Sequence, residues 1–327
     1  MEVTPKQQKR HLGETQPVAG EQPRVVESLF HRPDVHRAMI VVFNPVAGMR
    51  RVSLLWRVLD VLVANGIRIE LAETHRSGHA EALTREAVCR GASMVVAAGG
   101  DGTIAEVANG LLGSPARLGV IPLGSANVVA HELSLPFEPR AVAAALAFGR
   151  TQPLWPGVAS GAEGSRLFVQ MLGVGFDAQV VHRLPRGLKR VLGRGAYALQ
   201  TLREAAVYRA APIRVRLDGE ETEAASVIVS KGRLYGGRFL LAPAACPSQP
   251  GFTVVLFDRA GTAATLLYGA ALPLGLLGRA PGIRHVRARR IDFIGNQPAL
   301  AQADGDAAGW TPITVTDAPA AIPIVVT

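Results

Sequence analysis

The sequence predicts a parallel α/β domain followed by a mainly antiparallel β domain. Three observations support this fold class. The chain has 327 residues, enough for about two domains with cores of their own. Up to about residue 152, short apolar runs alternate with amphipathic stretches, which is typical of a parallel sheet covered by helices. Beyond residue 152, strand-like runs follow one another with Gly, Pro or Asp turns between them, as in antiparallel sheets.

The first part of the chain contains four apolar runs that we expect to be strands, at residues 39–43, 67–72, 94–98 and 118–121. We expect helices at about 53–64, at 79–90, from the glycines after 98 to about 111, from about 127, and at 139–148. Leu55, Leu59 and Leu62 recur at the spacing of one helical face, and Asn65-Gly66 is a typical helix end.

The second part is expected to contain strands at 167–172, 213–217, 226–230, 252–257 and 322–326. Two helical insertions, at about 185–209 and 262–277, interrupt this pattern. The second insertion lies in an apolar stretch, 260–278, that is roughly long enough to cross a bilayer. Because Gly269, Pro273 and Gly275 interrupt this stretch, we expect a buried or interfacial helix rather than a membrane span.

The composition is that of a globular protein, with 48% hydrophobic and 19% charged residues, and it excludes a disordered or fibrous chain. Two cysteines, Cys89 and Cys246, cannot form a disulfide framework, and no Cys/His cluster has zinc-binding spacing. We therefore expect a reducing, cytoplasmic compartment. Residues 1–36 are polar and lack the apolar core of a secretory signal, so we expect a flexible tail.

The net charge of +9 is concentrated in two basic stretches. Residues 182–216 contain nine Lys or Arg and one acid, and residues 279–290 contain five Arg and no acid. Such stretches are typical of proteins that bind nucleic acid, an anionic membrane surface or a phosphorylated substrate. Composition alone does not choose among these partners.

A glycine-rich motif, Gly99-Gly100-Asp101-Gly102-Thr103, lies between an expected strand and an expected helix. Phosphates bind at this place in α/β folds, because glycine lets the backbone approach them and free N–H groups at the helix start donate to them. Asp101 adds a carboxylate that can hold Mg²⁺ or orient a reacting group. The alternative is a tight glycine turn that Asp or Thr caps.

Small or polar residues also follow the other expected strands of the first domain. They are Asn44-Pro45 with Gly48, Thr74, and Pro122-Leu123-Gly124-Ser125-Ala126-Asn127. Because the carboxyl ends of parallel strands share one edge of a sheet, these residues should converge with the glycine-rich motif. Their size and polarity suit the phosphates and ribose of a nucleotide.

Taken together, the motifs resemble the diacylglycerol kinase catalytic family, which includes bacterial diacylglycerol kinases, sphingosine kinases and ceramide kinases. The matching residues, between about Met39 and Asp306, are Asn44-Pro45 with Gly48, Thr74 with Gly78-His79-Ala80, residues 99–103 with Glu106 and Asn109-Gly110, residues 122–127, Gly173-Val174-Gly175-Phe176-Asp177-Ala178, and Asp304-Gly305-Asp306. NAD kinases and phosphofructokinases share the Gly-Gly-Asp-Gly part alone, so the specificity lies in the whole set.

The resemblance implies a nucleotide-binding α/β domain at 37–152, joined by a C-terminal strand within 312–327, and a lipid-binding β-sandwich at 153–311. It implies ATP-dependent phosphorylation of a lipid hydroxyl in the cleft between these domains. By motif match, the ATP-binding residues are Asn44, Thr74, Gly99, Gly100, Asp101, Gly102, Thr103, Ser125 and Asn127. Asp101 would place Mg²⁺ and the γ-phosphate. Asp306, or else Asp304, would accept the hydroxyl proton, and Asp177 would lie near the lipid headgroup or cap a turn.

Three departures from the family pattern affect these expectations. The C-terminal motif ends in Asp306 where the family has Glu, which shortens the reach of the base by about 1.5 Å. Val128 follows Asn127 where many bacterial members have Asp, which favours ceramide or a sphingoid base as substrate. The turn at 248–251 lacks two carboxylates with which bacterial members hold a structural Mg²⁺, so we do not expect that site.

We therefore expect an ATP-dependent kinase of a diacylglycerol-type membrane lipid, with ceramide or a sphingoid base as the alternative substrate. NAD kinase, and a lipid-binding protein without catalysis, are less favoured alternatives. Nucleic acid is not an expected partner, because the basic segment 183–216 has few aromatic residues for stacking. We expect both basic stretches to dock the protein on an anionic membrane at its cytoplasmic face. The sequence does not indicate an oligomeric state.

Overall fold

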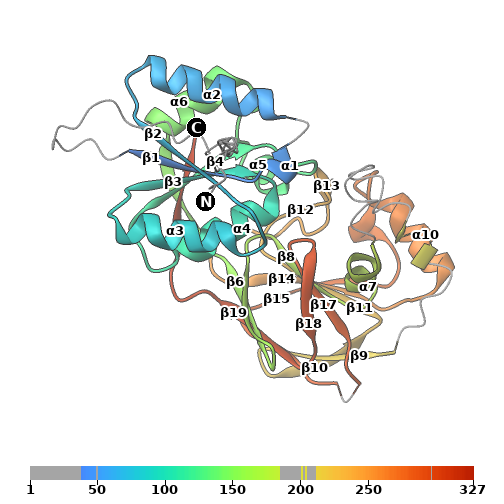
Figure 1. Cartoon of the computed structure of the whole chain (residues 1–327). Helices are drawn as coiled ribbons and strands as arrows, with labels where there is room; N and C mark the ends of the chain where they lie inside the picture. The colour runs from blue at the N-terminus through green and yellow to red at the C-terminus, as the bar shows by residue number, and fades with distance from the viewer. Residues whose placement is uncertain (1–37, 49–50, 185–199, 202, 205–210, 296) are drawn as a thin grey trace, which may run out of the picture. The chain divides into compact units, whose positions relative to one another are not determined.

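The computed structural model describes residues 38–48, 51–184, 200–201, 203–204, 211–295 and 297–327 (Figure 1). The expected tail at 1–36 and nearly all of the expected insertion at 185–209 lie outside the described residues. Arg37–Thr327 is one compact unit. In the described part of this unit, the strands form three six-stranded sheets and one two-stranded sheet.

The first sheet has the strand order β2-β1-β3-β4-β20-β5. Its strands are β1 (Met39–Phe43), β2 (Ile69–Glu73), β3 (Met94–Gly99), β4 (Arg117–Pro122), β5 (Arg150–Leu154) and β20 (Ile322–Val326). Strands β1 to β4 are parallel, whereas β20 is parallel to β4 and antiparallel to β5. Every residue of β1 and β3 is buried, as continuous apolar runs require in a sheet covered on both faces.

Helices cover both faces of this sheet (Figure 1). They are α1 (Pro45–Gly48), α2 (Val52–Ala64), α3 (His79–Cys89), α4 (Asp101–Leu111), α5 (Val128–Glu132) and α6 (Pro139–Phe148). Helices α2 and α6 pack together, and their apolar side chains share a core with Val41 and Val96. The side chains of α3 and α4 form a second core with Val42 and Val95. Leu55, Leu59 and Leu62 are buried, which confirms the predicted face of α2.

The remaining strands form an antiparallel β-sandwich. One sheet has the order β10-β9-β16-β19-β6-β7 and the other β15-β14-β11-β8-β17-β18. The strands are β6 (Gly157–Gly161), β7 (Gly164–Phe168), β8 (Met171–Val174), β9 (Ile213–Leu217), β10 (Glu220–Ala224), β11 (Ser226–Ser230), β14 (Phe252–Phe257), β15 (Ile283–Ala288), β16 (Ile291–Phe293), β17 (Leu300–Ala303), β18 (Asp306–Trp310) and β19 (Ile313–Asp317). Phe168 and Phe293 from the first sheet share one core with Val174 and Val254 from the second.

Three smaller elements accompany the sandwich. A short hairpin joins β12 (Leu234–Tyr235) to β13 (Phe239–Leu240), helix α7 (Phe176–Arg183) follows β8, and helix α10 (Thr262–Ala271) follows β14. The expected helix at 262–277 thus ends at Ala271. A turn through Gly275, at φ +68°, and a short 3₁₀ helix at Leu277–Arg279 complete this segment. Proline and glycine after position 271 do not continue an α-helix.

One expected strand is divided in the structure. The run 167–172 is split between β7 and β8, which belong to different sheets of the sandwich. The backbone N–H groups of the intervening residues donate to the Asp304 carboxylate instead of to a neighbouring strand. The range 312–327 contains two strands: β19 belongs to the sandwich, and β20, at the expected residues 322–326, belongs to the first sheet.

A buried lysine ties the turn at 248–251 to strand β19. The Lys231 side chain is fully buried, and its ammonium donates to the carbonyls of Gln249 (3.1 Å) and Gly251 (2.9 Å) and to Asp317 Oδ1 (2.7 Å). Asp317 Oδ2 also accepts the Gly251 N–H at 2.7 Å. Burial lowers the pKa of Lys231, and the Asp317 carboxylate opposes this shift. This turn, which lacks the family's carboxylates, is therefore held by an ammonium group.

We predict that Lys231→Met lowers the free energy of unfolding by about 3 to 5 kcal/mol, because it leaves the Asp317 carboxylate and two carbonyls without their cation. Urea denaturation of both proteins measures this change. Arg85→Met is the matched control, since Arg85 and Glu81 form an exposed ion pair on α3 and should contribute little. Equal losses in the two variants would contradict the structural role of Lys231.

Candidate functional site

The glycine-rich loop between β3 and α4 lies directly against the loop after β4. A Cβ atom built on Gly124 would lie 2.5 Å from the Gly100 Cα atom, and one built on Gly100 would lie 3.3 Å from the Gly124 Cα atom. A Cβ on Gly99 would overlap Thr103, with 2.4 Å to its Oγ1. Only glycine permits this backbone approach, and Gly99 and Gly100 leave bare backbone directly before Asp101, the first residue of α4.

Asn44 and Thr74 lie at the same edge of the sheet. Asn44 Nδ2 donates to Thr103 Oγ1 (3.1 Å), its Oδ1 accepts the Val46 N–H (3.1 Å), and its own N–H donates to the Ala98 carbonyl (3.0 Å). Thr74 is buried, and its N–H donates to the Phe43 carbonyl at 2.8 Å. Both residues are thereby fixed at the ends of β1 and β2.

The loop after β4 presents one buried amide with unused hydrogen-bonding capacity. Asn127 is 1% exposed and has a left-handed backbone, with φ +48°. Its Nδ2 donates to the Gly124 carbonyl at 2.8 Å, whereas its Oδ1 is buried and accepts no hydrogen bond from any described residue. Such an atom is costly unless a ligand or water satisfies it. Ser125, two residues earlier, is exposed.

Asp101 is the first residue of α4, and its carboxylate reaches the start of α5. Its Oδ1 accepts the Val129 N–H at 3.0 Å. Burial raises the pKa of Asp101, and hydrogen bonds from backbone N–H groups, including those of Val128 and Val129, partly oppose the shift. Asp101 therefore links the loops after β3 and β4.

A second acid of α4, Glu106, holds the loop after β2. Its two carboxylate oxygens accept the N–H groups of Gly78 (2.9 Å) and Ala80 (3.0 Å). Gly78 has φ +78°, so it begins α3 in a left-handed conformation that glycine adopts without strain. The position of this loop, which follows Thr74, thus depends on a side chain from the helix after the glycine-rich motif.

The two acids of the C-terminal motif differ in their surroundings. Asp304 has φ +49° and accepts the N–H groups of Val169 (2.6 Å), Gln170 (2.9 Å) and Met171 (2.9 Å). Burial raises the pKa of Asp304 to about 6, backbone N–H groups oppose the shift, and the negative charge of Asp101 adds to it. Asp304 therefore holds the crossover from β7 to β8.

Asp306, in contrast, is exposed and lies beside the glycine-rich loop. Its Oδ2 is 3.5 Å from the position of a Cβ built on Gly102 and 3.5 Å from Arg166 Nη2. Arg166 also donates to the Ala307 carbonyl at 2.7 Å, so it supports the strand that carries Asp306. The structure thus brings Asp306, rather than Asp304, to the surface of the glycine-rich loop.

Asp177 is 9% exposed and lies in the first turn of α7. Its two oxygens accept hydrogen bonds from the Tyr235 hydroxyl (2.5 Å) and from Gln302 Nε2 (2.7 Å), and burial raises its pKa. Gln302 Oε1 in turn accepts the Gly305 N–H at 2.8 Å. These bonds connect Asp177 to the turn between Asp304 and Asp306. Gln302 and Tyr235 were not anticipated from the sequence, because neither belongs to a recognisable motif.

A further buried acid, Glu132, was also missed. It is 5% exposed, and its carboxylate accepts hydrogen bonds from Arg233 Nε (2.8 Å) and the Leu234 N–H (2.9 Å). These contacts join α5, which follows Asn127, to the β12 hairpin of the sandwich. The feature of the sequence that could have indicated Glu132 is its position five residues after the Gly124-Ser125-Ala126-Asn127 segment.

Comparison with known proteins agrees with this arrangement. Residues 38–157 match the diacylglycerol kinase catalytic domain, and residues 170–326 match the YegS C-terminal NAD kinase beta sandwich-like domain. A relative in Pseudomonas aeruginosa (strain UCBPP-PA14), named "Probable lipid kinase YegS-like", is 34% identical over 212 residues, which is 62% of this chain and 68% of that protein. The chain belongs to the YegS-like and diacylglycerol kinase family of lipid kinases. The predicted resemblance and fold class are confirmed.

Other members of the lipid kinase family extend the comparison. The diacylglycerol kinase of Bacillus subtilis is 27% identical over 278 residues, 83% of this chain and 90% of that protein. In two other YegS-like relatives, the aligned part spans only 61% and 58% of their length. A crystal structure of a diacylglycerol kinase from Bacillus anthracis str. Sterne superposes with a TM-score of 0.68 at 18% identity, over 89% of this chain and 97% of that one, which shows a shared fold.

We predict that Gly124→Ala lowers the free energy of unfolding by about 1 to 3 kcal/mol, because the new methyl group would overlap the Gly100 backbone. Thermal denaturation measures the loss. Gly269→Ala is the control, since a Cβ at Gly269 in α10 meets no atom within 4 Å and should leave stability equal or slightly higher. If both variants melted with the wild type, the contact between the two loops would not exist in solution.

We predict that the Asp304 carboxyl group titrates near pH 6, well above an ordinary aspartate. Because the native pKa exceeds that of the unfolded chain, protonation favours the folded state. The contribution of this group is therefore fully present below about pH 4 and declines as the pH rises through about 6. Carbon-13 NMR of labelled aspartate carboxyls measures the titration, with Asp304→Asn to assign the signal. A midpoint near pH 4 would contradict the burial of this group.

Proposed function

We propose that the protein transfers the γ-phosphoryl group of ATP to a hydroxyl of a diacylglycerol-type membrane lipid. The observation that carries this proposal is the position of Asp306, whose carboxylate oxygen lies 3.5 Å from the Cβ position of Gly102 in the glycine-rich loop. A carboxylate beside a phosphate-binding loop is suited to accept a proton from an attacking alcohol. Family membership supports the same reaction class.

Two features of the site fit a bound nucleotide. The contact between Gly100 and Gly124 leaves bare backbone directly before α4, where phosphate groups are well accommodated. The buried Asn127 Oδ1, which has no partner among the described residues, is available to a hydrogen-bond donor of the nucleotide. Asn44, Thr74, Gly99, Thr103 and Ser125 would complete the binding surface.

Mg²⁺ would be held by Asp101, together with phosphate oxygens and water. Among the described residues, no group of three or more His, Cys, Asp or Glu side chains is arranged to hold a metal ion, and Mg²⁺ commonly takes one or two carboxylates plus substrate phosphates. The ion would neutralise negative charge on the phosphate groups. Asp101 itself is held in place by the Val129 N–H.

In the proposed reaction, Asp306 accepts the hydroxyl proton as the lipid oxygen forms its bond to the γ-phosphorus and the bond to ADP breaks. Arg166 positions Asp306 through its side chain and through the Ala307 carbonyl. Asp177, Gln302 and the Gly305 N–H position the turn from the other side. Asp177 thereby helps to position Asp306 through Gln302 and the Gly305 N–H. It is also proposed to lie near the lipid headgroup.

The protein is proposed to act at the cytoplasmic face of an anionic membrane. The basic stretch 279–290 supports this location, although two of its arginines form ion pairs within the protein, Arg284 with Asp258 and Arg290 with Asp292. In the stretch 182–216, Arg183 pairs with Glu204, and Arg214 and Arg216 pair with Glu221. The other basic residues between 185 and 199 lie outside the described residues.

The decisive experiment presents diacylglycerol, monoacylglycerol, ceramide and sphingosine separately in micelles with labelled ATP and Mg²⁺. We expect diacylglycerol to be phosphorylated. Label in ceramide or sphingosine instead would assign the alternative substrate that Val128 favours. If no lipid is labelled, the kinase proposal fails, and the protein is better described as a lipid-binding member that has lost catalysis.

We predict that Asp306→Asn lowers kcat on the preferred lipid by about 100-fold or more, because the amide cannot accept the proton. Asp306→Glu restores the residue typical of the family and should retain activity. Asp60→Asn, at an exposed position of α2, is the control for an aspartate outside the site. Steady-state assays with labelled ATP compare the variants. Full activity in Asp306→Asn would rule out Asp306 as the base.

A further inference from the structure

The segment 261–278 contains no Asp, Glu, Lys or Arg residue, although it lies at the protein surface. It includes α10 and the turn that follows it. Helix α10 has ten residues and is therefore about 15 Å long, half the thickness of a bilayer core. In the described part of the chain, none of the helices has the length and apolar character that a membrane span requires. The absence of charge needs another explanation.

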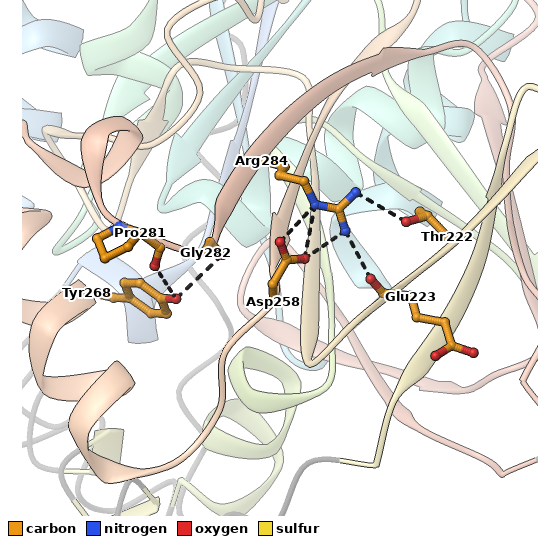
Figure 2. A network of polar contacts seen from close by, with 7 residues as sticks. All are labelled: Thr222, Glu223, Asp258, Tyr268, Pro281, Gly282 and Arg284. Atoms are coloured by element: carbon orange, nitrogen blue, oxygen red, sulfur yellow. Dashed lines mark hydrogen bonds and ion pairs between the residues drawn. The ribbon is translucent and has the colours of Figure 1, made fainter.

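Tyr268 fixes which face of α10 points inward. It is the buried residue of the helix, and its hydroxyl donates to the Pro281 carbonyl at 3.1 Å (Figure 2). Its ring lies edge-on to Phe257, with 5.5 Å between the centroids. Ala264 and Ala271 pack into the same cluster, which covers Ile228 and Val255 of the sandwich. The orientation of the helix is thus set by contacts on one side.

Four leucines of the segment, two on α10 and two in the turn after it, are exposed. Leu266, Leu267, Leu274 and Leu276 are 52%, 42%, 70% and 44% exposed, and we call these four residues the leucine ridge. A surface helix normally places polar residues on its outer face. Large apolar side chains that gather on a surface indicate a binding partner.

Two arginines flank the leucine ridge in the chain, Arg259 before it and Arg279 after it. Between Asp258 and Asp292 the chain has six arginines and no acid. Asp258, the acid before the ridge, is held by Arg284 through Nη2–Oδ1 (2.7 Å) and Nε–Oδ2 (2.9 Å) contacts, as Figure 2 shows. Arg259 and Arg279, which bound the uncharged segment, are both exposed. Within 258–292, which the structure describes in full, the acid next to the ridge is thus paired, and both flanking arginines face outward.

We propose that the leucine ridge inserts into the headgroup region of an anionic membrane, with Arg259 and Arg279 contacting lipid phosphates. Apolar residues flanked by arginines are typical of elements that lie in the membrane interface. A second copy of the chain fits less well, because a twofold contact would place this arginine-rich surface against itself. The inference rests on the proposed function, since it supplies a way for the kinase to reach a lipid that stays in the bilayer.

The test measures binding of the full chain to vesicles without ATP, so its outcome does not depend on catalysis. Vesicles contain phosphatidylcholine alone or equal parts of phosphatidylcholine and phosphatidylglycerol. We expect Leu266→Ser/Leu274→Ser to weaken binding to the mixed vesicles by about tenfold or more, because two exposed leucines no longer enter the bilayer. Phe148→Ser removes an apolar side chain that is 87% exposed on α6, and it should bind as the wild type does.

Two further variants make the result specific. Arg259→Gln/Arg279→Gln should weaken binding only where phosphatidylglycerol is present, and added salt should reduce the difference. Leu266→Gln/Leu274→Gln repeats the loss with a better helix former, in case serine destabilises α10. Activity on a short-chain, water-soluble diacylglycerol should be unchanged in the leucine variants, which separates docking from catalysis.

Binding of both leucine variants with wild-type affinity would overturn the proposal. A second result would also overturn it: the wild type is a dimer, and the leucine substitutions dissociate this dimer without changing vesicle binding. The ridge would then be an interface between copies of the chain. Loss of binding in Phe148→Ser to the same degree would also overturn it. If the variants bind vesicles as expected but the assay with labelled ATP phosphorylates no lipid, the docking inference stands and the proposed function fails.

Discussion

The arrangement of the site depends on one half-buried carboxylate. Asp304 accepts three consecutive backbone N–H groups at residues 169–171, the point where the chain leaves one sheet of the sandwich and enters the other. Burying this charge is unfavourable, as its raised pKa shows, and the three N–H groups offset part of that cost. The same interaction fixes the turn that carries Asp306. The crossover of the sandwich and the position of the proposed base are thus set together.

A second constraint acts from the α/β domain. The loops after β3 and β4 approach so closely that neither Gly100 nor Gly124 can carry a side chain without movement of the other loop. Asp101 adds a link from α4 to the start of α5. The bare backbone of the glycine-rich loop therefore has a defined position against which Asp306 can be placed. Positional accuracy of this kind is the main contribution of a protein to phosphoryl transfer.

Many of the positively charged side chains in this protein are paired with nearby acceptors. Lys231 is buried, and its ammonium supports the turn at 248–251. Several arginines of the basic stretches pair with neighbouring acids and contribute little to an outward field. Arg284 has a particular effect, because it neutralises the acid before the leucine ridge. The surface potential thus reflects which arginines lack such partners, and not the net charge of +9 alone.

Much of the fold could be predicted from the sequence, because its signals are local. Apolar runs such as 39–43 and 94–98 are buried on both faces, and the spacing of Leu55, Leu59 and Leu62 indicated the inner face of α2. Glycines before α4 indicated a close backbone approach, although not its partner. The helix expected at 262–277, in contrast, ends at Ala271, because proline and glycine beyond that residue do not continue it.

Other features were decided only by the tertiary structure, because they depend on residues far apart in the chain. Asp304 and Asp306 are two residues apart, yet Asp304 is half-buried and accepts N–H groups 133 to 135 positions away, whereas Asp306 is exposed beside Gly102. No local pattern distinguishes them. The partners of Asp177, Lys231 and Arg284 are likewise distant. The sequence by itself determined the family and most of the elements, because these depend on local motifs and periodicity, whereas long-range packing decided which polar groups are buried, which are paired and which are exposed.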